Sequence, residues 1–460
     1  MKDYAGTSFW LETCGDDLTP RPSLDGSVDV DVAILGAGYS GLWTAYYLLR
    51  REPSMRIAIV ESEIAGFGAS GRNGAWCTSS FPVSAQVLAE RFGRERTRCV
   101  EFAMRDTVNE VARVCEAENI DAHFRKGGAL EIARGRHEVP LIEAEYAAYE
   151  SLDLADGYAL LDRQELEERI CVQDGQGALF VRDCATIHPG RLVRGLARAV
   201  ERHGAAIFER TQVTGYSAGP RPVLHTNQGD VRAGTVVLAG EAYLSRLRPL
   251  HRQILPVYSL IVLTEPLTET QWREIGWRDH ECVSSNKYVI DYLSRTVDGR
   301  ILFGSRGEPY HFGSRIEDSC DRHEPTHKAI KGQVVEWFPM LRGVHFTHTW
   351  GGPVGMPRDF MPSVRYERET GVATARGYTG QGVATTNLAG RCLADLITGI
   401  SSPLTELPMA GHRSRDWEPE PFRWLAVRSM QWAYEGIDAR AARTGRAPSG
   451  RSLPERLGRH

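Results

Sequence analysis

The sequence predicts an α/β protein in which a Rossmann-type domain is interleaved with an α+β domain that contains an antiparallel sheet. Three observations carry this prediction. A strand, a glycine turn, a helix and a second strand follow one another within about thirty residues near the start of the chain. Further short apolar runs, typical of strands, follow after residue 204. Three later runs are separated by long polar links or by a tight turn, which is typical of antiparallel strands.

The composition is that of an ordinary globular protein. The chain has 460 residues, 42% of them hydrophobic and 25% charged, with a formal net charge of -4. These values exclude a disordered or fibrous chain and argue against a nucleic-acid-binding protein. The nine cysteines include no CxxC pair, so we predict neither a disulfide framework nor a metal site. No apolar run approaches the ~18 residues of a membrane span, and we expect a cytoplasmic protein.

The first predicted unit is a βαβ unit. Residues 30–35 form a short apolar run that ends at Gly36, and the amphipathic helix after it must stop before Pro53. A second apolar run at 56–60 ends at Glu61. This order of elements predicts two neighbouring parallel strands joined by a crossover helix.

The middle of the chain adds an insertion and then returns to the first sheet. Residues 84–170 have helical spacing, interrupted by a predicted strand at 128–133. Pro189 opens a helix that ends just before Gly204. Further strands are predicted at 205–208, 223–226 and 235–239, and we expect them to rejoin the first sheet. The domain that contains this sheet is therefore predicted to be discontinuous.

A second, antiparallel sheet is predicted from strands at 257–264, 288–292 and 300–304. A last strand–turn–helix unit then runs from Val372 to Ile397. After Gly411 the tail holds ten arginines, and its segment 421–443 is amphipathic. Because acidic residues are interspersed among these arginines, we expect a helix docked on the body.

The turn Gly36-Ala37-Gly38-Tyr39-Ser40-Gly41 is a GxGxxG motif between a predicted strand and a predicted helix. Gly36 makes the tight turn, Gly38 lets a pyrophosphate approach the helix N-terminus, and Gly41 permits close packing of helix on strand. Glu61 follows Gly41 by twenty residues and is placed to hydrogen-bond a ribose diol. The predicted ligand of this unit is therefore FAD or NAD.

A second glycine-rich loop favours FAD over NAD. Residues 66–74 read GFGASGRNG and are dense in backbone amides and small hydroxyls that can wrap a further part of an extended cofactor. The chain holds one GxGxxG motif, so we do not expect a second domain for NAD. The FAD contacts predicted from this loop are Gly68, Ala69, Ser70, Gly71, Arg72, Asn73 and Gly74.

Taken together, these motifs resemble a known family. GAGYSG at 36–41, GASGRNG at 68–74, the strand block at 289–304 and GYTGQGV at 377–383 are similar to the glycine oxidase and D-amino-acid oxidase superfamily, and most of all to its gamma-glutamylputrescine oxidase branch. The resemblance covers residues 28–400. It implies an FAD domain interleaved with a substrate domain whose antiparallel sheet lies over the flavin ring. The implied divisions are 28–83, 171–250 and 345–400 for the FAD domain, 84–170 and 251–344 for the substrate domain, and 401–460 for a C-terminal extension.

In this family the late glycine turn meets the flavin itself. A strand that ends in Gly377, followed by Gly380 and Gly382 at the start of a helix, aims backbone amides and a positive helix end at a nearby group. The positive helix end stabilises a reduced flavin, because the flavin becomes anionic when it is reduced. The contacts that the resemblance implies here are Gly377, Thr379, Gly380, Gln381, Gly382 and Val383, with Val213, Gly240 and Gly352 elsewhere.

The chemistry that the resemblance implies is oxidation of a small primary or secondary amine. A hydride leaves the carbon next to nitrogen, water hydrolyses the imine, and oxygen is the expected acceptor, giving hydrogen peroxide. We expect FAD to be non-covalent, because no cysteine lies between 320 and 392, where monomeric sarcosine oxidase has its anchor. Aromatic rings would pack against the amine and Asp291 would pair with a distal charge. The pocket candidates are Tyr258, Tyr288, Asp291, Tyr292, Arg306, Trp350, Met356 and Arg358.

Three alternatives stay open. The first is a dehydrogenase of an amine or amino acid that passes electrons to a quinone or a protein partner. The second is an amino-acid oxidase, which would gain support if Arg306 or Arg358 faced the flavin. The third is a flavin-bound assembly or RNA-associated protein whose functional part is the arginine-rich tail. The sequence does not determine the oligomeric state.

Overall fold

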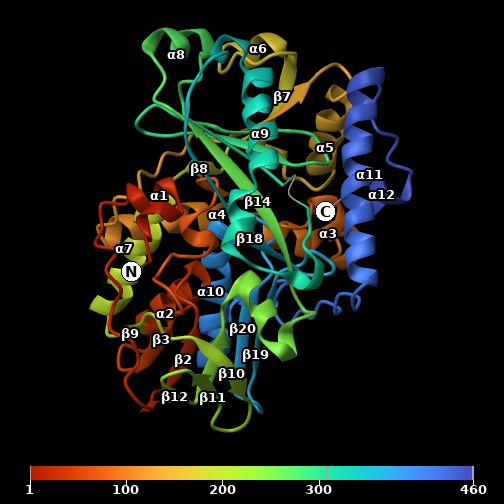
Figure 1. Cartoon of the computed structure of the whole chain (residues 1–460). Helices are drawn as coiled ribbons and strands as arrows, with labels where there is room; N and C mark the ends of the chain where they lie inside the picture. The colour runs from red at the N-terminus through yellow and green to blue at the C-terminus, as the bar shows by residue number, and fades with distance from the viewer. Residues whose placement is uncertain (1, 307–308, 458–460) are drawn as a thin grey trace.

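A computed structural model describes residues 2–306 and 309–457. One of its two main sheets has six strands in the order β19-β20-β13-β2-β3-β9 and lies in the lower half of Figure 1. All neighbours run parallel except β19, which is antiparallel to β20. The strands are β2 (Val32–Leu35), β3 (Ile57–Val60), β9 (Ala206–Phe208), β13 (Thr235–Leu238), β19 (Ser363–Glu367) and β20 (Val372–Arg376). The predicted Rossmann-type sheet is confirmed.

Helices cover this sheet because its strands are apolar on both faces. β3 reads IAIV and is buried throughout, as parallel strands in layered α/β folds are. Four helices contribute most of the helical residues that pack with strand residues in one hydrophobic core. These helices are α2 (Tyr39–Arg51), α4 (Arg94–Ala117), α7 (Pro189–Arg202) and α10 (Gly382–Thr398). At the start of α7, Nδ1 of His188 accepts a hydrogen bond from the Arg191 amide at 3.2 Å, as expected for a helix-entry residue.

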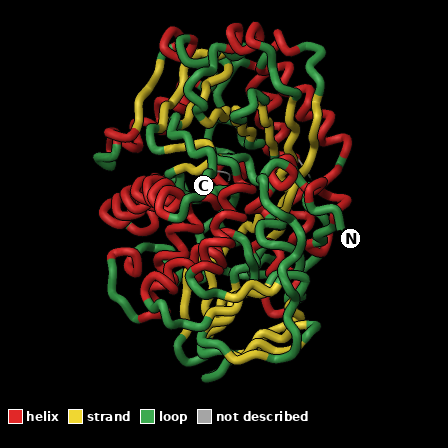
Figure 2. Tube along the Cα trace, turned by 90° about the vertical axis from the view of Figure 1, so that its left-hand side faces the viewer, coloured by secondary structure: helices red, strands yellow, loops and turns green. Residues whose placement is uncertain are grey.

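The second main sheet has eight strands in the order β18-β14-β17-β16-β15-β5-β7-β6 and lies mainly in the upper half of Figure 1. Its long strand β14 (Leu255–Thr264) lies second from one edge and is antiparallel to β17, as predicted, and to β18, whereas β15 and β5 pair in parallel. The other strands are β5 (Ala129–Arg134), β6 (Tyr158–Leu161), β7 (Gly175–Val181), β15 (Cys282–Ser285), β16 (Asp291–Arg295), β17 (Ile301–Ser305) and β18 (Phe346–Met356). The helices inserted between these strands are α5 (Val139–Ser151), α6 (Arg163–Glu167), α8 (Glu269–Ile275) and α9 (Glu324–Trp337). Figure 2 shows the two groups of strands toward opposite ends of the molecule.

Two small sheets complete the fold. One has the order β1-β12-β11-β10 and the other is the antiparallel pair β4-β8. The prediction that 223–226 returns to the main sheet is wrong, since this segment, β11, pairs with β10 and β12. A short apolar run fits a hairpin as well as a parallel sheet, so the sequence pattern did not separate them. The bounds are β1 (Val28–Asp29), β4 (Trp76–Thr78), β8 (Cys184–Thr186), β10 (Val213–Ser217), β11 (Val223–Thr226) and β12 (Gly229–Arg232).

The structure also moves several predicted boundaries. Strands β7 and β18, placed by the predicted divisions in the FAD domain, belong to the eight-stranded sheet. Helix α4, placed in the substrate domain, buries Val100, Met104 and Val108 in the core under the six-stranded sheet. The predicted strand 288–292 begins only at Asp291. Amphipathic spacing shows which face of an element is buried but not which partner buries it.

The C-terminal extension is helical and docked, as predicted. Helix α11 (Phe422–Thr444) runs along one side of the molecule in Figure 1, and α12 (Leu453–Leu457) follows. The Asp438 carboxylate on α11 accepts hydrogen bonds from the amides of Tyr288 at 3.1 Å and Val289 at 2.9 Å. Residues 458–460 of the extension lie outside the described residues. The remaining helices are α1 (Phe9–Glu12) and α3 (Ala85–Phe92). Within the described ranges, no helix has the length and apolarity to cross a membrane.

Candidate active site

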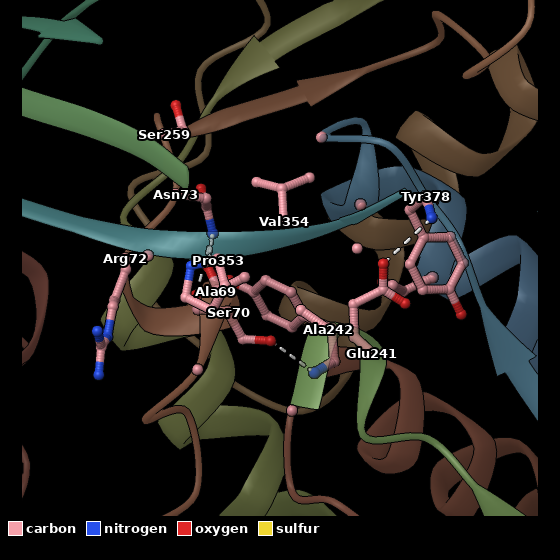
Figure 3. Close-up of a pocket in the computed structure, with 18 of the residues that line it drawn as sticks. Ala69, Ser70, Arg72, Asn73, Glu241, Ala242, Ser259, Pro353, Val354 and Tyr378 are labelled. Atoms are coloured by element: carbon pink, nitrogen blue, oxygen red, sulfur yellow. Dashed lines mark hydrogen bonds between the residues drawn. The ribbon is translucent and has the colours of Figure 1, made fainter. Parts of the chain in front are cut away.

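A cavity of about 860 Å³ follows the carboxyl ends of the parallel strands and extends to residues of the eight-stranded sheet. At its floor lie Gly36 after β2, Glu61 after β3 and Gly240 after β13. Strand β14 contributes Ser259 to its roof and β18 contributes Val354, and Figure 3 shows both residues. Ligands of open α/β sheets bind at this end of the strands.

The first glycine turn leaves no room for side chains. A Cβ atom on Gly41 would lie 2.0 Å from the carbonyl oxygen of Gly36, and one on Gly38 would lie 3.0 Å from Oγ of Ser70. Gly36 has a φ of +102°, which favours glycine. Helix α2 begins at Tyr39 after Gly38, which has no side chain to cap it, and Gly38, Tyr39 and Ser40 line the cavity, so the positive end of the helix faces it. This cradle fits a pyrophosphate.

Glu61 stands at the end of β3, where a ribose is expected. Its carboxylate accepts hydrogen bonds at 3.0 Å from the amides of Ala37 and Glu63, which fixes its orientation. Burial raises the pKa of Glu61. The Ser62 hydroxyl donates a third hydrogen bond at 3.2 Å. Because a carboxylate has about four lone-pair sites, acceptor capacity remains for a hydroxyl of a ribose diol. Val213 on β10 lines the same end of the cavity.

The second glycine-rich loop is held rigidly against the first turn. Oγ of Ser70 accepts a hydrogen bond from the Tyr39 amide at 2.9 Å. Nδ2 of Asn73 donates to the carbonyl of Ser70 at 3.0 Å, which ties the loop to itself. Arg72 lines the cavity, but its guanidinium donates to the carbonyl of Phe67 at 2.7 Å and to the Asp321 carboxylate at 2.5 Å. Arg72 therefore connects this loop to the segment that contains Asp321.

The late glycine turn differs in detail from the prediction. The Glu241 carboxylate accepts hydrogen bonds from the amides of Gly377 at 2.9 Å and Tyr378 at 3.3 Å, and Figure 3 shows Glu241 pointing at this turn. These two amides are therefore not free for a cofactor. Helix α10 begins at Gly382 without a capping side chain, and residues 380–383 line the cavity. The open helix end remains available to a flavin.

Most residues predicted to bind the cofactor lie along this cavity. The predicted residues that line it are Gly36, Gly38, Tyr39, Ser40, Glu61, Gly68, Ala69, Ser70, Arg72, Asn73, Gly74, Val213, Gly240, Gly352, Gly380, Gln381, Gly382 and Val383. Gly41, Gly71, Gly377 and Thr379 do not line it. Gly41 and Gly71 instead pack against backbone carbonyls of their own turns.

Three of the predicted substrate-pocket residues come together in the roof of the cavity. Asp291 and Tyr292 lie at the start of β16 and Arg306 follows β17. The Tyr292 hydroxyl is 2.8 Å from Oγ of Ser259, and Nη2 of Arg306 donates to the carbonyl of Thr379 at 2.7 Å. This hydrogen bond joins the roof directly to the late glycine turn.

Five other pocket candidates do not line the cavity. On β14 the cavity contacts Ser259, so Tyr258 points to the opposite face, where its hydroxyl accepts a hydrogen bond from the Glu317 amide. Tyr288 stacks on Tyr434 of α11 at 5.5 Å. Trp350 is buried, and its Nε1 donates to the carbonyl of Arg72 at 2.9 Å.

Met356 and Arg358 are also engaged elsewhere. Met356 packs in a cluster with Trp417, and its carbonyl accepts a hydrogen bond from Nε1 of that residue at 2.8 Å. Arg358 forms an ion pair with Glu418 and lies over the Trp417 ring. Both residues therefore connect β18 and the loop after it to the C-terminal extension.

The sequence analysis missed several lining residues. Ser259 and Glu241 are two of them, and Glu101, Glu131 and Glu145 line a further part of the cavity. Glu241 had a usable signal, since it closely follows the carboxyl end of a predicted strand. Glu101 and Glu145 had none, because they come from stretches of ordinary helical spacing, and Glu131 lies on the predicted strand 128–133, for which the sequence did not specify the face that meets the cavity.

Glu241→Ala is expected to lower the free energy of unfolding by about 1–3 kcal/mol, because two backbone amides lose their acceptor. Burial raises the pKa of Glu241 from 4.5 to about 7. The folded chain therefore binds the proton of Glu241 more tightly than the unfolded chain does. The stabilisation that Glu241 contributes is complete below pH 4.5 and is lost as the pH rises through about 7. Urea unfolding of the apoprotein should show a larger loss at about pH 5 than at about pH 8. The exposed Glu369→Ala is the control, and equal losses at both pH values would contradict this account.

The sequence of the chain is similar to those of known oxidoreductases. The chain is 29% identical over 395 residues to gamma-glutamylputrescine oxidoreductase of Escherichia coli (strain K12), covering 85% of this chain and 89% of the relative. It is 31% identical over 401 residues to the probable oxidoreductase OrdL of Rhizobium meliloti (strain 1021), covering 86% and 89%.

A solved structure shows the same fold. The crystal structure of glycine oxidase from Geobacillus kaustophilus superimposes with a TM-score of 0.70 at 20% identity, covering 84% of this chain and 99% of that one. The family model described as FAD dependent oxidoreductase (DAO) matches residues 31–396, which include the glycine turn, Glu61 and the late turn. The chain is therefore an enzyme of the DAO family of FAD-dependent oxidoreductases, and FAD is its cofactor.

Proposed function

We propose that this enzyme oxidises a small primary or secondary amine. The observation that carries the proposal is the charge of the cavity beyond the FAD cradle. Carboxyl groups there outnumber basic groups, and an acidic cavity attracts an amine more strongly than it attracts an anionic substrate. The acidic residues are Asp291, Glu101, Glu131 and Glu145, against Lys287 and Arg306.

The residues of the roof position the substrate in this proposal. The Tyr292 ring is fixed, because a Cβ atom on Gly304 would lie 2.1 Å from it and its hydroxyl is held by Ser259. Such a fixed ring offers a flat apolar wall for the carbon next to the amine nitrogen. Oδ1 of Asp291 accepts hydrogen bonds from the amide and hydroxyl of Ser285, which orients the carboxylate.

FAD, when bound along the cradle, supplies the acceptor for the hydride that leaves the amine carbon. The protein's own tasks are to hold the amine, limit water in the cavity and admit an electron acceptor. Among the described residues no cysteine lines the cavity, and Cys77 is fully buried on β4, which supports non-covalent FAD. Oxygen is the proposed acceptor, and hydrogen peroxide and an aldehyde are the proposed products.

Turnover assays test this proposal. The purified holoenzyme should release hydrogen peroxide and an aldehyde from at least one amine in air. If amine oxidation requires a quinone and releases no peroxide, the electron acceptor is the quinone and not oxygen, and the proposed amine oxidation still holds. Turnover of amino acids alone would contradict the proposal. Acid precipitation should leave the yellow colour in the supernatant, as expected for non-covalent FAD.

One observation favours a second candidate, oxidation of an amino acid. Arg306 lines the cavity, and among the described residues its guanidinium forms one hydrogen bond, to the carbonyl of Thr379, and pairs with no carboxylate. An arginine in this state is able to bind a substrate carboxylate through two parallel hydrogen bonds. Arg358 does not support this candidate, since it is paired with Glu418.

Arg306→Met separates the two candidates. If the substrate is a simple amine, kcat/KM should fall less than about tenfold, because no charge pair with the substrate is lost. If the substrate carries a carboxylate that Arg306 binds, kcat/KM should fall about 100-fold or more. Steady-state kinetics with an amine and the matching amino acid measure both values. Arg358→Met is the control and should change neither substrate's kinetics.

A further inference from the structure

Helix α11 has one face that the rest of the described chain leaves uncovered. Three large apolar side chains on this face are exposed, Phe422 by 65%, Leu425 by 51% and Trp432 by 58%. Figure 1 shows the helix along one edge of the molecule. Apolar side chains that gather on one exposed surface mark a site of interaction, because their contact with water is unfavourable.

The residues of this face follow the heptad spacing of paired helices. They are separated alternately by three and four positions, so they form one continuous seam along the helix. All six members of the seam are exposed and uncharged. They are Phe422, Leu425, Ser429, Trp432, Gly436 and Ala439.

The opposite face of α11 is fixed on the body of the protein. Trp424 and Val427 pack against a buried cluster that includes residues of β14. Tyr434 stacks on Tyr288 at 5.5 Å, and the Asp438 carboxylate accepts two backbone hydrogen bonds from the same loop. The seam therefore belongs to a helix that is already docked, and little conformational freedom is lost when a partner binds to it.

The order of side-chain sizes makes the seam complementary to itself. Large side chains stand in its first half and small ones in its second half. In an antiparallel pair of α11 helices whose centre lies between positions 430 and 431, Phe422 is opposite Ala439 of the second copy. Leu425 is opposite Gly436, where no described atom lies within 4 Å of an added Cβ. Facing positions that combine a large and a small side chain interdigitate well.

Charges beside the seam agree with the same arrangement. Arg428 and Glu435 occupy equivalent positions of successive heptads, so they lie on the same side of the seam. In the antiparallel pair, Arg428 is within about 3 Å along the helix axis of Glu435 of the second copy. In the described ranges neither residue forms an ion pair within its own chain. The twofold symmetry of such a pair produces this contact between opposite charges twice.

Other partners fit the seam less well. A parallel pair of helices would place Phe422 against Phe422 and Gly436 against Gly436 of the second copy, which leaves a gap at one end. A helix that lies on a membrane surface needs a basic polar face in contact with water and lipid headgroups. The polar and basic positions opposite the seam are docked on the body instead.

We propose that the seam of α11 binds the same seam of a second copy of the chain, so that the enzyme is a twofold-symmetric dimer. The two helices lie antiparallel, and each subunit covers the apolar side chains of the other. A helix of 23 residues is about 35 Å long. Such an interface is at the small end of the range for specific dimers, so we expect a dissociation constant of about 1–100 µM.

Sedimentation velocity of the full-length holoenzyme over about 1–200 µM measures this dissociation constant. Leu425→Glu should raise it about 100-fold or more, because a charge enters the centre of the interface. Gly436→Leu should raise it about tenfold or more, because the added side chain fills the space that Leu425 of the second copy takes. The control is Val297→Glu in the turn between β16 and β17, where Val297 is 48% exposed, and it should change nothing. Flavin content and thermal unfolding show that each variant is folded.

Charge reversal tests the antiparallel arrangement itself. Arg428→Glu and Glu435→Arg should each raise the dissociation constant about tenfold, because two attractive contacts become repulsive. The two substitutions together should return it to within about threefold of the original value.

A monomer at every concentration would overturn the inference, and so would a dimer that the seam variants leave unchanged. A double charge variant that is as weak as the single ones would also overturn it. Vesicles that contain phosphatidylserine are the last probe. If they bind a monomeric enzyme and Leu425→Glu abolishes that binding, the seam meets a lipid surface and the dimer is contradicted.

Discussion

Gly41→Ala is expected to weaken FAD binding strongly. The added Cβ atom would lie 2.0 Å from the Gly36 carbonyl oxygen and 3.1 Å from Cγ2 of Ile34. Backbone atoms cannot move aside as a flexible side chain does, so α2 must shift away from β2. The start of α2 and the first glycine turn form the pyrophosphate cradle, and a shift of the helix dismantles it.

The expected magnitude is a loss of about 100-fold or more in FAD affinity, or roughly 3 kcal/mol. Flavin content after purification and titration of the apoprotein with FAD measure it. The control is Gly332→Ala on α9, where nothing lies within 4 Å of the added atom. Thermal unfolding of both apoproteins separates a lost cradle from a lost fold. Full flavin content in Gly41→Ala would show that this turn does not hold the cofactor.

Asp321→Ala is expected to lower the free energy of unfolding by about 3–5 kcal/mol. Arg72 is 4% exposed and Asp321 is 9% exposed, so the substitution leaves a buried guanidinium without its carboxylate. The same guanidinium also donates to the carbonyl of Gly351 on β18. The pair therefore connects the second glycine loop to the eight-stranded sheet, and FAD binding should weaken along with stability.

A double-mutant cycle of Arg72→Met and Asp321→Ala checks this interpretation. The double variant removes both charges and should be less destabilising than Asp321→Ala alone. The exposed pair Arg163 and Glu167 is the reference, since Glu167→Ala should cost less than about 0.5 kcal/mol. Urea unfolding gives all of these values. Additive losses in the cycle would show that the two buried charges do not stabilise each other.

The cofactor cradle was predictable from sequence because its chemistry is local. Gly36, Gly38 and Gly41 are required by the conformation and packing of one turn, and Glu61 follows at the end of the adjacent strand. Such requirements hold for any chain that binds a dinucleotide in this way. The glycines and their order along the chain were therefore sufficient to place the cradle.

The substrate end was less predictable because it depends on which face of each strand meets the cavity. Alternation along β14 separates Tyr258 from Ser259 but does not tell which of them faces the flavin. Tyr288 is held by Asp438 and Tyr434, which follow it by about 150 residues in a helix whose docking position the sequence did not specify. The carboxyl groups of Glu101, Glu131 and Glu145 reach the same cavity only through tertiary packing.

The most direct test of the account is anaerobic addition of amines to the purified holoenzyme while the flavin absorbance is recorded, followed by admission of air. The account predicts that the yellow colour bleaches with an amine and returns in air with formation of hydrogen peroxide. A flavin that no amine bleaches, or that only amino acids bleach, would contradict it.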